Sequence, residues 1–222
     1  ASISQGQGIN ILLNLFFGPM VNAARAVAYQ IQTAVNHFVI NFLMATRPQV
    51  IKSFAEHNYE RMYSLTFKSA RYSFFLMLAL ILPICFELRF ILNLWLGKAT
   101  PPDTYVFTLI ILLLSLAEVF RASMIMAFHA IGKMKLGNSL NGTIMILSLP
   151  ISYAILKMGA PAYAVFIVLV IINITVMIDA YFIVYSYVHF NIRELLVGAV
   201  LPCVLVGACS VIVPTAIVYL ME

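Results

Sequence analysis

Long apolar segments recur along the chain and are separated by short polar ones. We predict that seven of them are membrane-crossing helices, at residues 2–18, 21–46, 72–94, 104–130, 138–157, 161–188 and 195–220. Most of them reach the length of about 20 residues that a helix needs to cross a hydrocarbon core of about 30 Å. The pattern therefore predicts an all-α fold, a polytopic membrane bundle in which residues 1–222 form one embedded lobe.

The two ends of the chain suggest that the lobe belongs to a longer protein. The first predicted helix is short and begins with polar residues, so we expect the sequence to start inside a helix, with Gly18 and Pro19 breaking it before the next one. The last predicted helix ends on the outer side, so we expect a further inward-running helix after it. No basic stretch followed by a short apolar core opens the chain, and no signal peptide is predicted.

One long polar connection, residues 47–71, separates the second and third predicted helices. We expect Pro48 to stop the second helix, because the residue before a proline disfavours helical backbone. Within the connection, residues 53–68 mix aromatic and charged side chains, as in a helix that lies on a membrane surface. A solvated connector is equally compatible with these residues, and both interpretations remain open.

Basic residues indicate how the bundle is oriented, because Lys and Arg in short loops mark the cytoplasmic side. The loops on one side carry Arg47, Lys52, Arg61, Lys68, Arg71, Lys133, Lys135 and Arg193. The loops on the other side carry Arg89, Lys98 and Lys157. We therefore predict that residues 47–71 are a cytoplasmic connector and that the first helix runs outward.

Composition agrees with a membrane protein. Hydrophobic residues make up 63% of the chain and charged residues 9%, against about 25% charged residues in an ordinary soluble domain. The formal charge of +5 does not indicate a nucleic-acid partner, because the basic residues are scattered between apolar segments. Cys85, Cys203 and Cys209 lie in apolar stretches without metal-type spacing, so we expect buried thiols and neither disulfides nor zinc.

Polar residues follow one face of the second predicted helix. One set is spaced by three or four residues and falls within an arc of about 80°: Asn22, Arg25, Tyr29, Gln32 and Asn36. A second set widens the polar face to about half of the helix: Gln30, Thr33, His37 and Asn41. Polar side chains are costly inside a membrane, so the face indicates either a solvated, substrate-binding cavity or hydrogen bonds between helices.

Arg25 is the most informative of these residues. A permanent cation within a membrane span needs a partner, and a guanidinium matches phosphate oxygens in a bidentate manner. Contact with an anionic ligand, snorkelling to the outer headgroups and a structural ion pair are the three interpretations that the sequence leaves open.

Two later helices carry ionisable residues that are candidates for ion coupling. Glu118 and Arg121 are three residues apart on one predicted helix, so they can neutralise each other as a local pair or serve a proton or substrate. Asp179 lies near Asn173 and Thr175 without an obvious local partner. Ion coupling and pairing between helices both remain open for this carboxylate.

The sequence gives no sign of catalysis, a cofactor or a metal. His37 and His129 have no second ligand at metal spacing. No glycine-rich phosphate loop, serine elbow or pair of catalytic carboxylates is present, and the outer loops are short. We therefore expect a protein that is not an enzyme.

Several segments resemble the carboxyl-terminal half of polysaccharide flippases, including O-antigen transporters, in the multidrug, oligosaccharidyl-lipid and polysaccharide exporter superfamily. They are Gly6-Gln7-Gly8-Ile9-Asn10, Asn14-Leu15-Phe16-Phe17-Gly18-Pro19, Asn22-Ala23-Ala24-Arg25-Ala26, Arg47-Pro48-Gln49-Val50-Ile51-Lys52-Ser53, Leu94-Trp95-Leu96-Gly97, Ala130-Ile131-Gly132-Lys133 and Leu149-Pro150-Ile151-Ser152-Tyr153. The resemblance extends over nearly the whole chain.

This resemblance implies a bacterial inner-membrane protein in which two helical lobes flank a central cavity. It implies that the chain is the second lobe, that an amino-terminal lobe is its partner, and that alternating access moves undecaprenyl-diphosphate-linked oligosaccharide outward for cell-surface polysaccharide such as lipopolysaccharide. Arg25 is then expected to face the diphosphate while the polyprenyl tail stays in membrane lipid. A cation-coupled drug antiporter of the same superfamily and a structural membrane subunit are the alternatives.

Overall fold

The computed structural model describes residues 2–132, 134–187 and 192–221, and every regular element in these ranges is a helix. The α-helices are α1 (Ser2–Phe17), α2 (Pro19–Ala55), α3 (Tyr59–Phe86), α4 (Leu88–Leu96), α5 (Thr104–Ile131), α6 (Met134–Lys157), α7 (Ala164–Tyr187), α8 (Ile192–Leu195) and α9 (Leu201–Met221). A 3-10 turn, η1 (Gly97–Ala99), follows α4, and a π-helical turn, η2 (Leu196–Val200), joins α8 to α9.

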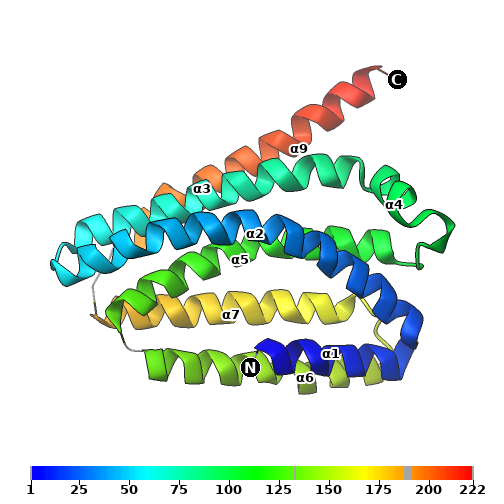
Figure 1. Cartoon of the computed structure of the whole chain (residues 1–222), viewed down its shortest axis with the longest axis horizontal. Helices are drawn as coiled ribbons and strands as arrows, with labels where there is room; N and C mark the ends of the chain where they lie inside the picture. Colours follow the sequence, from blue (N-terminus) through cyan, green and yellow to red (C-terminus); the bar gives the residue numbers. More distant parts are fainter. Residues whose placement is uncertain (1, 133, 188–191, 222) are drawn as a thin grey trace.

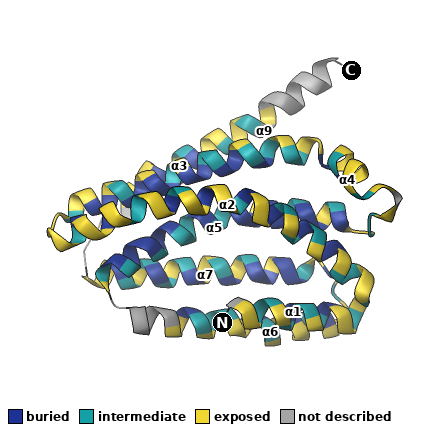
Figure 2. Cartoon of the chain, viewed as in Figure 1, coloured by how far each residue is buried: buried dark blue, intermediate teal, exposed yellow. Residues whose placement is uncertain are grey.

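The long helices lie side by side in a bundle (Figure 1). The helix α2 packs against α5 and α3, and α5 also packs against α7. The short helix α1 contacts α2 and α6, whereas α9 packs against α3. Figure 2 shows buried residues concentrated along the contacts of α2, α5 and α7, with exposed residues on the outer faces.

Five helical stretches among the described residues are long and apolar enough to cross a membrane: Tyr59–Phe86, Thr104–Ile131, Ser139–Lys157, Ala164–Tyr187 and Arg193–Ser210. Their outer faces expose large apolar side chains, such as Ile171 and Phe182 on α7, which is the arrangement that lipid favours. The chain is therefore an all-helical membrane bundle, as the sequence predicts. Helices α1 and α2 are not among these five, so their membrane crossings remain predictions.

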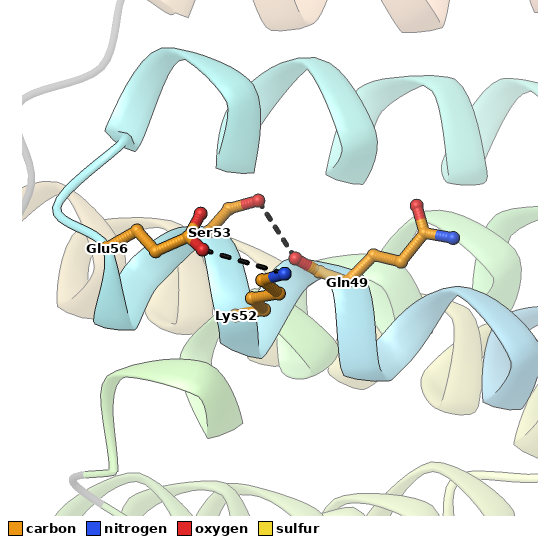
Figure 3. A network of polar contacts seen from close by, with 4 residues as sticks. All are labelled: Gln49, Lys52, Ser53 and Glu56. Atoms are coloured by element: carbon orange, nitrogen blue, oxygen red, sulfur yellow. Dashed lines mark hydrogen bonds and ion pairs between the residues drawn. The ribbon is translucent and has the colours of Figure 1, made fainter.

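The prediction that Pro48 stops the second helix is wrong, because α2 continues through it to Ala55. Proline removes one backbone hydrogen bond, but packing of the following turn compensates, since Val50 and Ser53 are buried. Figure 3 shows this turn, in which Ser53 Oγ donates to the Gln49 carbonyl at 2.9 Å and Lys52 Nζ lies 3.7 Å from Glu56 Oε1.

Residues 47–71 are consequently not a separate connector. They form the end of α2, a short turn at residues 56–58 and the start of α3. The Asn58 side chain caps α3 by accepting from the Arg61 backbone N–H at 3.0 Å. A single surface helix over residues 53–68 does not form, because this turn divides the segment and Met62 and Phe67 are buried in the bundle.

The third predicted helix, residues 72–94, also has different bounds. Helix α3 starts at Tyr59 and ends at Phe86, and Glu87 separates it from the short helix α4. Leu88 and Leu92 of α4 are buried, whereas Phe90, Leu94 and Trp95 are exposed. Helix α4 therefore presents apolar side chains at the end of the bundle.

Links with many basic residues gather at one end of the bundle. The α2–α3 turn, the α5–α6 link and the start of α8 lie at the left in Figure 1, and the α1–α2, α4–α5 and α6–α7 links lie at the right. This alternation matches the sequence-based topology. Lys133 lies outside the described residues, as do the side chains of Lys98 and Lys135, and the cytoplasmic assignment of the left end remains a prediction.

Candidate functional site

Arg25 of α2 is buried inside the bundle, with 7% of its surface exposed. Its Nη1 donates to Asn10 Oδ1 of α1, and its Nη2 donates to the Gly6 carbonyl at 3.5 Å. The guanidinium carbon lies 4.6 Å from the centre of the Tyr29 ring, a cation–π distance. These contacts hold the cation against α1, so Arg25 does not snorkel to the outer headgroups.

A polar cavity of about 220 Å³ lies next to Arg25, where five helices meet. Its lining comes from α1 (Gln5, Gly6, Ile9), α2 (Arg25, Tyr29), α5 (Glu118, Arg121), α6 (Met145) and α7 (Leu169, Asn173). The volume corresponds to roughly seven water molecules at about 30 Å³ each. It suits water or a phosphate-sized anion and is too small for an oligosaccharide.

Two guanidinium groups give this cavity its chemical character. The Nε atoms of Arg25 and Arg121 are both buried and have no hydrogen-bond partner in the described part of the protein. Buried donors without acceptors are costly, so these N–H groups favour water or an anion nearby. With Glu118 as the carboxylate in the lining, two cations face one anion and the cavity favours negative ligands.

The three candidates for ion coupling are only partly brought together. Glu118 and Arg121 line the same cavity, but they do not form the close ion pair that their spacing favours within the described structure. Asp179 of α7 does not line the cavity, and its Oδ2 is buried without a hydrogen-bond partner among the described residues. Asn173 reaches the cavity and donates to the Leu169 carbonyl of its own helix at 2.9 Å.

The first polar set of α2 faces the bundle interior, and we call it the interior stripe: Asn22, Arg25, Tyr29, Gln32 and Asn36. Asn22 Nδ2 donates to the Asn10 carbonyl at 2.9 Å, and Gln32 Nε2 donates to Ser115 Oγ of α5 at 2.8 Å. Asn36 is half-buried. Asn22 and Gln32 therefore form hydrogen bonds between helices, whereas Arg25 and Tyr29 line the cavity.

The second polar set of α2 lies on the surface, and we call it the exposed stripe: Gln30, Thr33, His37 and Asn41. All four are exposed. Their spacing of three and four residues gives an arc of about 80°, centred about 100° around the helix from the interior stripe. Their helical spacing places these residues on the polar face of α2, and this spacing is the signal that identifies them as candidate ligands beside the interior stripe.

The histidines do not form a metal centre in the described structure. His129 of α5 contacts Arg47, whose Nη2 lies 3.4 Å from His129 Nδ1, and His37 is on the exposed stripe. Within the described residues, no three His, Cys, Asp or Glu side chains come together as metal ligands would.

Comparisons of the chain with protein families, with curated proteins and with solved structures give no significant match.

Proposed function

We propose that the chain is one lobe of a bacterial inner-membrane exporter that flips lipid-linked oligosaccharide outward by alternating access. The observation that carries this proposal is the exposed stripe, which presents amide, hydroxyl and imidazole groups on the surface of a membrane bundle. Such groups are costly against acyl chains. They favour a water-filled passage between this lobe and an amino-terminal lobe that faces it.

The two stripes suggest a division of roles. Gln30, Thr33, His37 and Asn41 offer uncharged donors and acceptors, which suit the hydroxyl groups of a sugar chain. The cavity beside Arg25 and Arg121 offers cationic donors, which suit a diphosphate. For the diphosphate to reach Arg25, the contacts between Arg25 and α1 must open, so we propose that separation of α1 from α2 accompanies transport.

The charge of the cavity argues against the closest alternative. An antiporter for organic cations requires an acidic binding site, whereas Arg25 and Arg121 outnumber Glu118 in the lining of this cavity. We therefore propose that the substrate is anionic and lipid-linked, of the undecaprenyl diphosphate type.

The exposed stripe provides the principal test of the proposal. We expect Gln30→Leu/His37→Leu/Asn41→Leu in the full-length protein to abolish surface polysaccharide and to leave lipid-linked oligosaccharide in the inner leaflet. The control is Ile40→Leu/Met44→Leu, which changes exposed apolar residues of the same helix. Surface polysaccharide at the normal level, with normal amounts of the triple variant in the membrane, would refute a passage along this face.

Arg25 is tested separately, because it also has structural contacts. We expect Arg25→Ala to abolish surface polysaccharide while the protein remains in the membrane at normal levels. Asn10→Ala is the matched control, since it removes the side-chain acceptor but retains the cation. If Arg25→Ala leaves surface polysaccharide unchanged, Arg25 has no part in the mechanism.

A further inference from the structure

A second site lies toward the end of the bundle that carries the α2–α3 turn (Figure 1). It is a groove of about 890 Å³ between the first turns of α3 and the α8–η2 segment. Lys68 and Arg71 of α3 and Arg193 of α8 line it, so basic side chains from two distant parts of the sequence face one groove. We call it the α3–α8 groove.

Two of the three cations of this groove, Lys68 and Arg71, are available to a ligand. Lys68 is exposed, Arg71 is half-buried with its guanidinium 5.3 Å from the Tyr72 ring centre, and neither forms an ion pair with a described residue. Glu60 and Glu194 also line the groove. Glu60 precedes Lys68 by eight residues, about 12 Å along the helix, so the basic residues of α3 lie toward the opposite end of the groove from Glu60.

Apolar surface adjoins these cations. Tyr63 and Phe67 line the groove as stacked rings with centres 6.3 Å apart. Val197 of η2 also lines it, and exposed Leu201 and Val204 continue from there along α9, which is part of a predicted membrane span. The site therefore combines a cationic end with an exposed apolar strip that runs along a membrane helix.

We infer that the α3–α8 groove binds an anionic phospholipid, with the headgroup phosphate at Lys68, Arg71 and Arg193 and an acyl chain along η2 and the start of α9. Basic residues at the bilayer surface attract anionic headgroups, and apolar surface beside them accommodates acyl chains. Free phosphate would use only the cationic part of the site. This lipid is a bound membrane component and not the transported substrate, so the inference is independent of the proposed function.

Native mass spectrometry of the full-length protein tests the inference with two probes, phosphatidylglycerol and phosphatidylcholine. We expect wild type to retain phosphatidylglycerol in preference to phosphatidylcholine, and Lys68→Gln/Arg71→Gln/Arg193→Gln to lose this preference. Each basic residue near an anionic headgroup contributes roughly a factor of five, so the loss should approach roughly a hundredfold. Lys68→Glu alone, at an exposed position, should lower phosphatidylglycerol retention without affecting folding.

The matched control is Lys52→Gln/Arg61→Gln/Arg89→Gln, which removes the same charge from residues outside the groove. It should retain phosphatidylglycerol as wild type does. Equal losses in the two triple variants would overturn the inference, because they would indicate attraction to total charge. Full displacement of phosphatidylglycerol by inorganic phosphate would also overturn it, because the site would then bind a free anion without help from acyl chains.

Discussion

The interior and exposed stripes of α2 have similar residue types but different surroundings. In the interior stripe, Gln32 finds Ser115 on α5 and Arg25 finds Asn10 on α1. In the exposed stripe, Gln30 and His37 face outward from the lobe. Because amides occur in both stripes, the surroundings of a polar residue in a membrane helix, and not its residue type, decide whether it bonds to another helix.

The largest expected difference between the stripes is in access to water. In a background without Cys85, Cys203 and Cys209, we expect Thr33→Cys to react many times faster with a water-soluble maleimide than Gln32→Cys does, because a thiol reacts as the thiolate and needs water. Labelling of intact membranes measures this difference. If Thr33→Cys reacts with a lipid-soluble maleimide but not with the water-soluble one, a water-filled passage along this face is contradicted.

Helix α1, which carries the partner of Asn22 and Arg25, also packs closely against α6. A Cβ added at Gly8 would lie 2.5 Å from Leu149 Cδ2, whereas a Cβ at Gly6 would meet nothing within 4 Å. We expect Gly8→Val to lower the free energy of unfolding by about 1–3 kcal/mol through overpacking. Unfolding in detergent measures it, with Gly6→Val as the control, and equal effects at both positions would argue against this packing.

Removal of a single interhelical hydrogen bond should have a smaller effect. We expect Gln32→Leu to lower the free energy of unfolding by about 0.6–2 kcal/mol, because Gln32 donates to Ser115 in the buried interface. A double-mutant cycle with Ser115→Ala isolates this contact. Gln30→Leu, on the exposed stripe, should leave the free energy of unfolding nearly unchanged, and a cycle with no coupling would show that the bond does not stabilise the bundle.

The smallest effect is expected at the exposed ion pair in Figure 3. Lys52 and Glu56 are four residues apart, and their side chains are 74% and 49% exposed. We expect Lys52→Gln to lower the free energy of unfolding by about 0.3–0.5 kcal/mol, with added salt removing the difference. If Lys52→Gln lowers the free energy of unfolding as much as Gln32→Leu does, the exposed ion pair stabilises the bundle as strongly as the buried hydrogen bond, contrary to this prediction.

Much of the fold is predictable from the sequence, because apolar length and helical period are local properties. The helices at residues 104–130 and 138–157 agree closely with α5 and α6. The errors occur where packing overrides local preference. Pro48 lies within α2 because Val50 and Ser53, which follow it, are buried. A local sequence pattern does not show which distant segments of the chain bury these two residues.

The candidate site is predictable only in part, for a related reason. Helical spacing identifies both stripes of α2, but the rotation of α2 about its axis decides which stripe is buried. That rotation depends on partners on α1 and α5, namely Asn10 and Ser115. The convergence of Glu118, Arg121 and Arg25 on one cavity likewise requires the packing of three helices.

The unbroken passage of α2 through Pro48 has a mechanical consequence. With 37 residues the helix is about 55 Å long, well beyond a hydrocarbon thickness of about 30 Å. A tilt of about 1° at the Gly18 break would displace the far tip by about 1 Å. In the proposed transport cycle, α2 would act as a lever, because a small opening beside α1 would produce a larger displacement at the Ala55 end of the helix.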